Sequence, residues 1–118
     1  MNPEAQRIAI AEACGWTECV FIEALCDCRG LPPEGYKGDT VYHDSPDCWL
    51  PDYLNDLNAM ADARKSLTSD QQEEFIYQLS LICCPITGET WEMVDSSAGQ
   101  QAETLLKTLG LWVEEDAQ

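Results

Sequence analysis

The chain has 118 residues, 45% of them hydrophobic, and its 22 acidic against 6 basic residues give a net charge of −16. This length predicts a single domain over residues 1–118, and the composition is that of a globular protein and not of a disordered one. Because the Lys and Arg residues that neutralise phosphates are scarce, direct binding to nucleic acid or to an anionic membrane is disfavoured.

The negative charge is spread evenly along the chain. Residues 1–59 and residues 60–118 each hold 11 acidic and 3 basic residues. Net charge bears on solubility and association and not on the fold. It therefore indicates either a surface that keeps the protein soluble or a surface that meets a basic partner.

The N-terminal stretch is not typical of a secreted or membrane protein. No apolar run reaches the roughly 18 residues that span a bilayer, and Glu4, Arg7 and Glu12 interrupt the region where a signal peptide would be apolar. We therefore expect a cytosolic protein with reduced thiols, most of them small apolar fillers. The seven cysteines are Cys14, Cys19, Cys26, Cys28, Cys48, Cys83 and Cys84.

The first part of the chain predicts a helix and a strand. Residues 3–14 form the helix, with Asn2 as N-cap, Pro3 at the first helical position and Gly15 as the stop. β-Branched and aromatic residues over 17–25 then predict a strand. The apolar face of the helix is expected to hold Ala5, Ile8, Ala11 and Cys14.

Residues 26–48 are interrupted by Gly and Pro and predict a long loop with one short strand over 40–42. Pro51 is then expected to open a second helix. The expected core face of that helix comprises Tyr53, Leu54, Leu57, Met60, Ala61 and Arg64.

A third helix is predicted to follow a capping box of Ser69 and Gln72 and to end at Pro85. Its expected apolar stripe comprises Phe75, Ile76, Leu79 and Ile82. Alternating residues over 89–95 predict another strand after a turn at Thr87 and Gly88.

The final helix is predicted to start at a capping box of Ser97 and Gln100 and to stop at Gly110. Its expected apolar face comprises Ala98, Ala102, Leu105, Leu106 and Leu109. The order of elements predicts an α+β fold in which a small sheet is covered by helices.

The sequence gives little support for a catalytic site or a metal-binding site. His43 lies beside Asp44 and Asp47 and could assist a cysteine nucleophile, but no nucleophile elbow, phosphate loop or His-Glu-x-x-His pair is present. We expect no enzyme, no cofactor and no catalytic residue. A zinc site is left open but not expected, because the gaps between its candidate ligands fit zinc poorly. Those candidates are Cys26, Cys28, His43 and Cys48.

The four tryptophans could line a pocket, although core packing is their commoner role. They are Trp16, Trp49, Trp91 and Trp112.

Three stretches carry a resemblance to a known family. "NPEAQRIAIAEACGWT", "LPDYLNDLNAM" and "LLKTLGLW", in this order, resemble the small bacteriophage and prophage proteins of the phage ABA-sandwich domain family. The resemblance implies an α/β/α sandwich with an antiparallel sheet of about three strands flanked by about four helices. It makes residues 26–48 the variable part, brings no catalytic residues and implies a phage accessory protein.

Acidity in a phage context predicts a protein that binds a host protein with a basic surface in the host cell cytoplasm. We expect inhibition of a nucleic-acid-handling defence complex, of the anti-CRISPR or anti-restriction type. A nucleotide-sequestering protein and a structural phage protein are the alternatives, and a homodimer is left open. The candidate partner-binding residues are Asp44, Asp47, Asp52, Asp56, Glu73 and Glu74.

Overall fold

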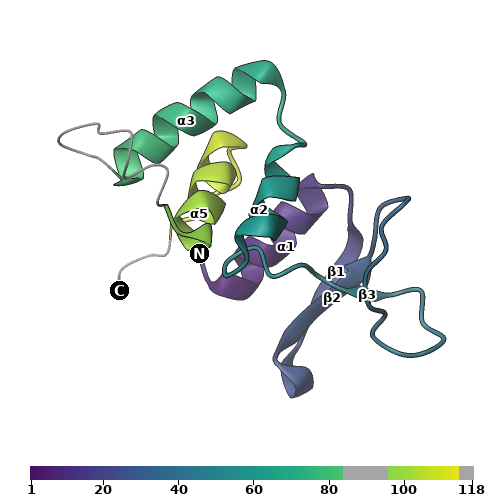
Figure 1. Cartoon of the computed structure of the whole chain (residues 1–118). Coiled ribbons are helices and arrows are strands. Elements are labelled where there is room, and N and C mark those ends of the chain that lie inside the picture. Colours follow the sequence, from purple (N-terminus) through teal and green to yellow (C-terminus); the bar gives the residue numbers. More distant parts are fainter. Residues whose placement is uncertain (84–95, 115–118) are drawn as a thin grey trace.

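The computed structural model describes residues 1–83 and 96–114. It is an α+β structure with four α-helices and one three-stranded antiparallel sheet in the described residues, as predicted (Figure 1). The elements are α1 (Pro3–Ala13), β1 (Thr17–Ile22), the 3-10 turn η1 (Glu23–Leu25), β2 (Asp27–Leu31), β3 (Cys48–Trp49), α2 (Leu57–Arg64), α3 (Ser69–Cys83) and α5 (Ala98–Thr108).

The sheet has the strand order β1-β2-β3, with both pairs antiparallel. Phe21 pairs with Cys28, and Gly30 pairs with Cys48. A Cβ at Gly30 would lie 2.9 Å from the Cys19 sulfur, so a glycine lets β1 and β2 approach closely here. Among the helices that the structure describes, α1 packs on this sheet and contacts both β1 and β2.

The described residues contain three strands, of which β1 starts at Thr17 as expected. The strand expected over 17–25 ends at Ile22, where the chain turns into η1. Within the expected loop, β2 is an additional strand, and the strand expected over 40–42 is a single bridge between Thr40 and Cys48. The strand expected over 89–95 lies outside the described residues.

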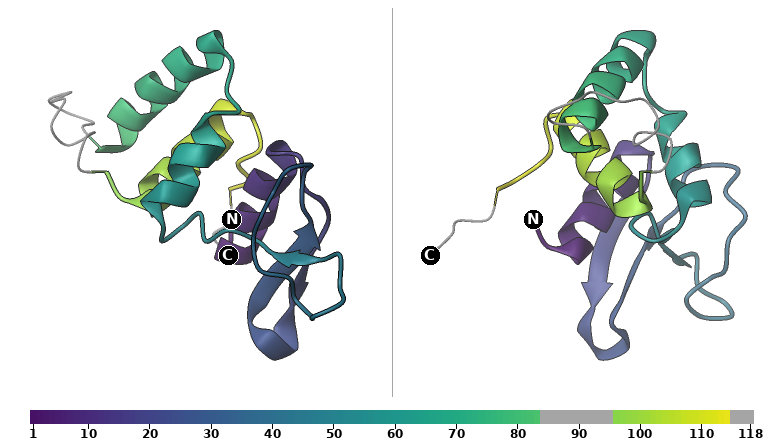
Figure 2. Two further views of the ribbon diagram at one scale, coloured as in Figure 1. Left: turned by 45° about the vertical axis from the view of Figure 1, so that its right-hand side comes forward. Right: turned by 60° about the vertical axis from the view of Figure 1, so that its left-hand side comes forward.

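The remaining helices are held together by α5, which contacts α1, α2 and α3. Figures 1 and 2 show the hairpin of β1 and β2 at one end of the molecule and α3 at the other. Residues from α1, α2 and α5 meet in the core and are completely buried, among them Ile10, Met60, Leu105 and Leu106. No helix of the described residues is long and apolar enough to cross a membrane.

The ends of α1 confirm the prediction from sequence. Asn2 Oδ1 accepts a 2.7 Å hydrogen bond from the Ala5 backbone N–H, and Gly15 leaves the helix with φ of +101°. Ile10 is more deeply buried than the expected face residue Ile8, because α5 covers that side of the helix.

The start of α2 corrects the prediction. Pro51 does not open the helix, which begins at Leu57 with Asp56 as its N-cap, accepting a 2.9 Å hydrogen bond from the Asn58 N–H. Of the expected core face, Tyr53 and Met60 are buried and Leu54 packs against the core, whereas Leu57 is 52% exposed. Ala63 is buried in α2 together with Met60.

The cap of α3 is shifted by one residue from the expected one. Thr68 Oγ1 accepts from the Gln71 N–H at 3.2 Å, and Gln71 Oε1 accepts from the Thr68 N–H at 2.9 Å. Of the expected stripe, Phe75 and Leu79 are buried and Ile76 is exposed. The expected stop at Pro85 lies outside the described residues.

Both ends of α5 are as expected. Ser97 and Gln100 form the reciprocal capping box, and Gly110 ends the helix with φ of +72°. Four of the five expected face residues are buried and Leu109 is partly buried against them. The backbone N–H of Trp112 donates to the Leu106 carbonyl, and this tryptophan packs against the core.

Candidate functional site

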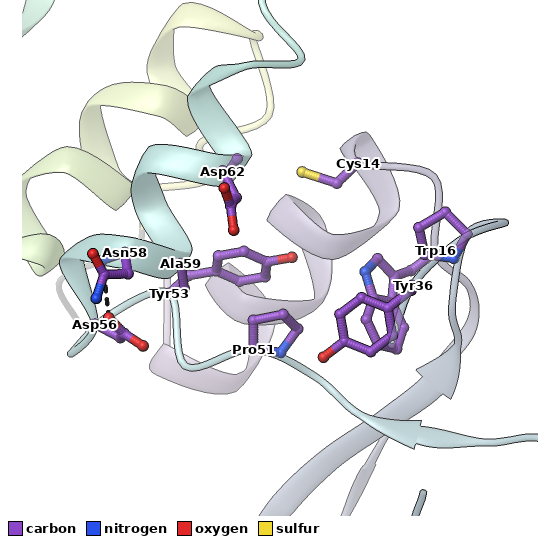
Figure 3. Close-up of a pocket in the computed structure, with 11 residues that line it drawn as sticks. Cys14, Trp16, Tyr36, Pro51, Tyr53, Asp56, Asn58, Ala59 and Asp62 are labelled. Atoms are coloured by element: carbon purple, nitrogen blue, oxygen red, sulfur yellow. Dashed lines mark hydrogen bonds between the residues drawn. The ribbon is translucent and has the colours of Figure 1, made fainter. Parts of the chain in front are cut away.

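A hollow of about 340 Å³ lies between the end of α1, the loop after β2 and the start of α2 (Figure 3). Its walls carry two prolines and three aromatic rings. Two aspartates and one asparagine from the cap and body of α2 add polar groups. No Lys or Arg is among the lining residues.

Gly15 brings the first aromatic ring to the hollow. Its positive φ turns the chain out of α1, so that Cys14 and Trp16 on either side of it both line the wall. The Trp16 ring is buried and meets the ring of Tyr36 edge to face, with centroids 4.8 Å apart and planes at 66°. Such an arrangement is favourable for two aromatic rings.

The loop after β2 fixes the position of Tyr36. The Trp16 ring packs against the Tyr36 ring, and the backbone at Gly38 passes close to it. A Cβ on Gly38 would overlap the Tyr36 ring. Tyr36 nevertheless keeps 37% of its surface exposed and can therefore contact a ligand.

Arg7 holds the next segment of the wall. Its Nε donates to the Pro51 carbonyl at 3.0 Å and its Nη2 to the Leu50 carbonyl at 2.5 Å. These bonds fix the backbone two residues before Tyr53, whose buried side chain forms the floor between α1 and α2. Arg7 thus positions a wall of the hollow, although it is not among the lining residues.

The Tyr53 hydroxyl and the Cys14 thiol lie close enough to influence each other's protonation, and Ser66 lies near the same thiol. Burial raises the pKa of the Cys14 thiol, and burial with the nearby Cys14 raises the pKa of the Tyr53 hydroxyl. Burial likewise raises the pKa of Tyr36. The two phenols and the thiol are therefore neutral at pH 7, and the Cys14 thiol is a weak nucleophile.

The negative charges of the hollow come from α2. Asp56 is the N-cap of the helix, and Asp62 lies six residues further along. In Figure 3 the Asp62 carboxylate points from α2 toward the space above the Tyr53 ring. Its Oδ1 lies 3.1 Å from Lys65 Nζ, and both side chains of this ion pair are largely exposed.

Neutral π faces with carboxylates at the rim suit a cationic group. An anionic ligand would meet two carboxylates and no lining base, so phosphate recognition is not supported at this hollow. The chemistry that these described residues offer is recognition of positive charge.

The six candidate partner-binding acids lie in three separate places. Asp44 is fully exposed in the loop before β3, whereas Asp47 in the same loop is ion-paired with Arg29. Asp52 is exposed and accepts from the Asn55 side-chain amide, and Asp56 caps α2. The remaining pair is exposed on α3, toward the other end of the molecule in Figure 1. That pair is Glu73 and Glu74.

The four candidate zinc ligands, at which a site is left open but not expected from the sequence, do not form a cluster. Cys28 and Cys48 are buried and Cys26 is exposed, while the His43 side chain is 99% exposed, with Nδ1 3.2 Å from Asp44 Oδ1. Across residues 1–83 and 96–114, no group of three or more His, Cys, Asp or Glu residues is placed to hold a metal ion.

Sequence reasoning named Trp16 as a residue able to line a pocket but missed Asp62 as a rim residue. Of the candidate acids, Asp56 is the one that lines the hollow. Asp62 follows Asp56 by six residues, a spacing that does not place two side chains on one face of a helix, so the sequence held no signal for this pair. Comparison of the chain with protein-family models, curated proteins and solved structures gives no match.

Proposed function

We propose that this protein is a non-enzymatic binding module whose acidic surface docks on a basic surface of another protein. The observation that carries the proposal is how five of the six basic side chains are used. Four of them are ion-paired with an acid of the same chain, and Arg64 lies 6.0 Å from the centroid of the Phe75 ring. The 22 acids therefore far exceed what the chain itself can neutralise.

This surplus charge has a physical consequence for association. Negative potential steers a basic groove toward the protein and disfavours like-charged partners. At 0.1 M salt, the interaction between exposed charges is largely screened beyond about 10 Å. This distance shortens as the salt concentration rises, so binding weakens.

The proposed partner is a host complex that handles nucleic acid, of the CRISPR-effector or restriction type, and the proposed role is inhibition in the host cytoplasm. Two considerations support it. A groove built for phosphates accepts carboxylates, and three stretches of the sequence resemble phage ABA-sandwich proteins.

The alternative of nucleotide sequestration is less well supported. A nucleotide site needs basic or amide donors near the phosphates. The 340 Å³ hollow has two carboxylates on its lining and no Lys or Arg. Thermal shift with cyclic nucleotides tests this alternative, and a stabilisation that saturates would favour it over protein docking.

The test combines phage protection with direct binding. Cells that carry a CRISPR or restriction system receive the gene, and plating of a targeted phage is measured. The purified effector is then titrated at several salt concentrations. We expect restored plating and an affinity that falls as salt rises. Absence of both protection and binding across such systems contradicts the proposal.

Three double variants locate the docking face because each removes two charges. They are Asp44→Asn with Asp47→Asn, Asp52→Asn with Asp56→Asn, and Glu73→Gln with Glu74→Gln. Each pair serves as a charge-matched control for the others. Circular dichroism of each variant shows whether the fold is kept. Equal weakening by all three contradicts a defined face and leaves only a general effect of net charge.

A further inference from the structure

We infer that the hollow beside α2 receives the guanidinium group of an arginine side chain presented by a basic protein partner. The inference rests on the proposed function and assigns it a specific contact. Three observations carry it, namely the aromatic walls, the position of the carboxylates and the absence of a lining base.

The aromatic walls are fixed before a ligand arrives. Trp16 and Tyr36 contact each other edge to face with centroids 4.8 Å apart, and the backbone at Gly38 lies close to Tyr36. Figure 3 shows these rings across the hollow from the ring of Tyr53, with Pro51 between them at the base. Trp16 and Tyr53 are almost completely buried, so the ring that an entering planar cation can reach is Tyr36. Trp16 already orders that ring, which reduces the entropy cost of binding.

The carboxylates lie on the opposite side. Asp62 projects from α2 and retains a free oxygen, because its single described ion pair with Lys65 uses Oδ1. Asp56 uses its Oδ1 as the cap of α2 and adds negative charge at the other end of the rim. Lys65 is the basic group that competes with a ligand for Asp62.

Arginine fits this combination better than lysine. A guanidinium is planar, stacks on aromatic rings and presents several donors in a fixed arrangement to a carboxylate. An ammonium is a compact and strongly hydrated charge that gives up more hydration in an aromatic site.

The experiment uses the full chain and three small probes at low salt. Nα-acetyl-arginine methylamide, its lysine counterpart and its uncharged citrulline counterpart are titrated into isotope-labelled protein, and amide and indole NMR shifts are followed. We expect saturable shifts centred on Trp16, Tyr36 and Asp62 with the arginine probe. The lysine probe should bind more weakly, and citrulline at least about threefold more weakly.

Single substitutions separate the contribution of the charged groups to arginine binding from that of the aromatic ring. Asp62→Asn should weaken arginine binding about two- to fivefold, the range of one exposed charge contact. Lys65→Gln should tighten it because the competing cation is removed. Asp70→Asn, which removes the same charge at an exposed position on α3, should leave it unchanged. Tyr36→Leu should weaken it about two- to fivefold through loss of the cation–π contact.

Two results would overturn the inference. One is equal binding of the arginine and citrulline probes, and the other is shifts that are insensitive to both Asp62→Asn and Tyr36→Leu. If a basic partner binds with salt dependence while the arginine probe does not bind here, the hollow is excluded and the proposed function stands. If the probe binds but no basic partner does, the guanidinium site stands and the proposed docking function falls.

Discussion

Arg7 Nη1 donates a 2.8 Å hydrogen bond to Asp27 Oδ1 and so joins α1 to the first residue of β2. The same guanidinium donates to the carbonyls of Leu50 and Pro51. One side chain thereby ties together a helix, a strand and the segment that leads into the candidate site.

Replacing Arg7 should therefore destabilise the fold more than an ordinary ion-pair deletion. The Arg7 side chain is 17% exposed, and Arg7→Met removes three hydrogen bonds. The Leu50 carbonyl loses its donor, whereas the Pro51 carbonyl keeps the Tyr53 N–H and Asp27 Oδ1 keeps the Cys28 N–H. We expect the free energy of unfolding to fall by about 2–3 kcal/mol, measured by urea denaturation. Lys65→Met breaks an ion pair whose lysine is 77% exposed, and should cost about 0–1 kcal/mol. Equal losses in the two variants would contradict the structural role of Arg7.

The second prediction compares the same substitution at two leucines. Leu105 is completely buried between α5 and its neighbours, and Leu105→Ala should cost about 2–5 kcal/mol through lost packing and the cavity left behind. Leu57→Ala at the exposed start of α2 should change stability by about 0.5 kcal/mol or less. Urea denaturation at pH 7 measures both. A large loss at Leu57 would mean that α2 starts earlier and buries this side chain, as the extrapolation from Pro51 predicted.

The third prediction concerns the start of α3. Because the Thr68 side chain caps the helix, Thr68→Ala should cost about 1 kcal/mol of unfolding free energy. Ser69→Ala, which the sequence would make the damaging change, should cost less than half of that value. Thermal and urea unfolding followed by circular dichroism provide the comparison. A larger loss at Ser69 would restore the predicted capping box of Ser69 and Gln72.

Local signals predicted the helix ends well where one residue could fill the role. Asn2, Ser97 and Gly110 act where the sequence places them, because capping and a left-handed stop depend on near neighbours alone. At α3 two successive residues, Thr68 and Ser69, each have a glutamine three positions later. The sequence alone does not say which of the two pairs caps the helix. In the structure the pair is Thr68 and Gln71.

Strand β2 could not be predicted in the same way. Asp27, Arg29 and Gly30 are poor strand formers, and the strand exists because β1 and β3 pair on either side of it. The candidate site could not be predicted from the sequence for a related reason. Trp16, Tyr36 and Asp62 are far apart in sequence and meet only through the turn at Gly15 and the bonds of Arg7.

The last prediction is a loss of stability at alkaline pH that depends on Cys19. Burial, followed by the nearby Glu12 and Cys28, raises the pKa of Cys19 from 9.0 to about 11. The unfolded chain thus releases this proton from about pH 9, while the folded protein retains it. Stability from this group is fully present below pH 9 and is lost as the pH rises toward 11.

The measurement is the free energy of unfolding from urea titrations between pH 8 and pH 11. Cys19→Ser removes the thiol, so its stability should decline less steeply above pH 9 than that of the parent protein. A residual decline is expected, because burial also raises the pKa values of Cys14 and Tyr53. Cys26→Ser removes an exposed thiol by the same change of atom and should follow the parent curve. If Cys19→Ser also follows that curve, the folded protein does not hold the Cys19 proton more tightly than the unfolded chain does.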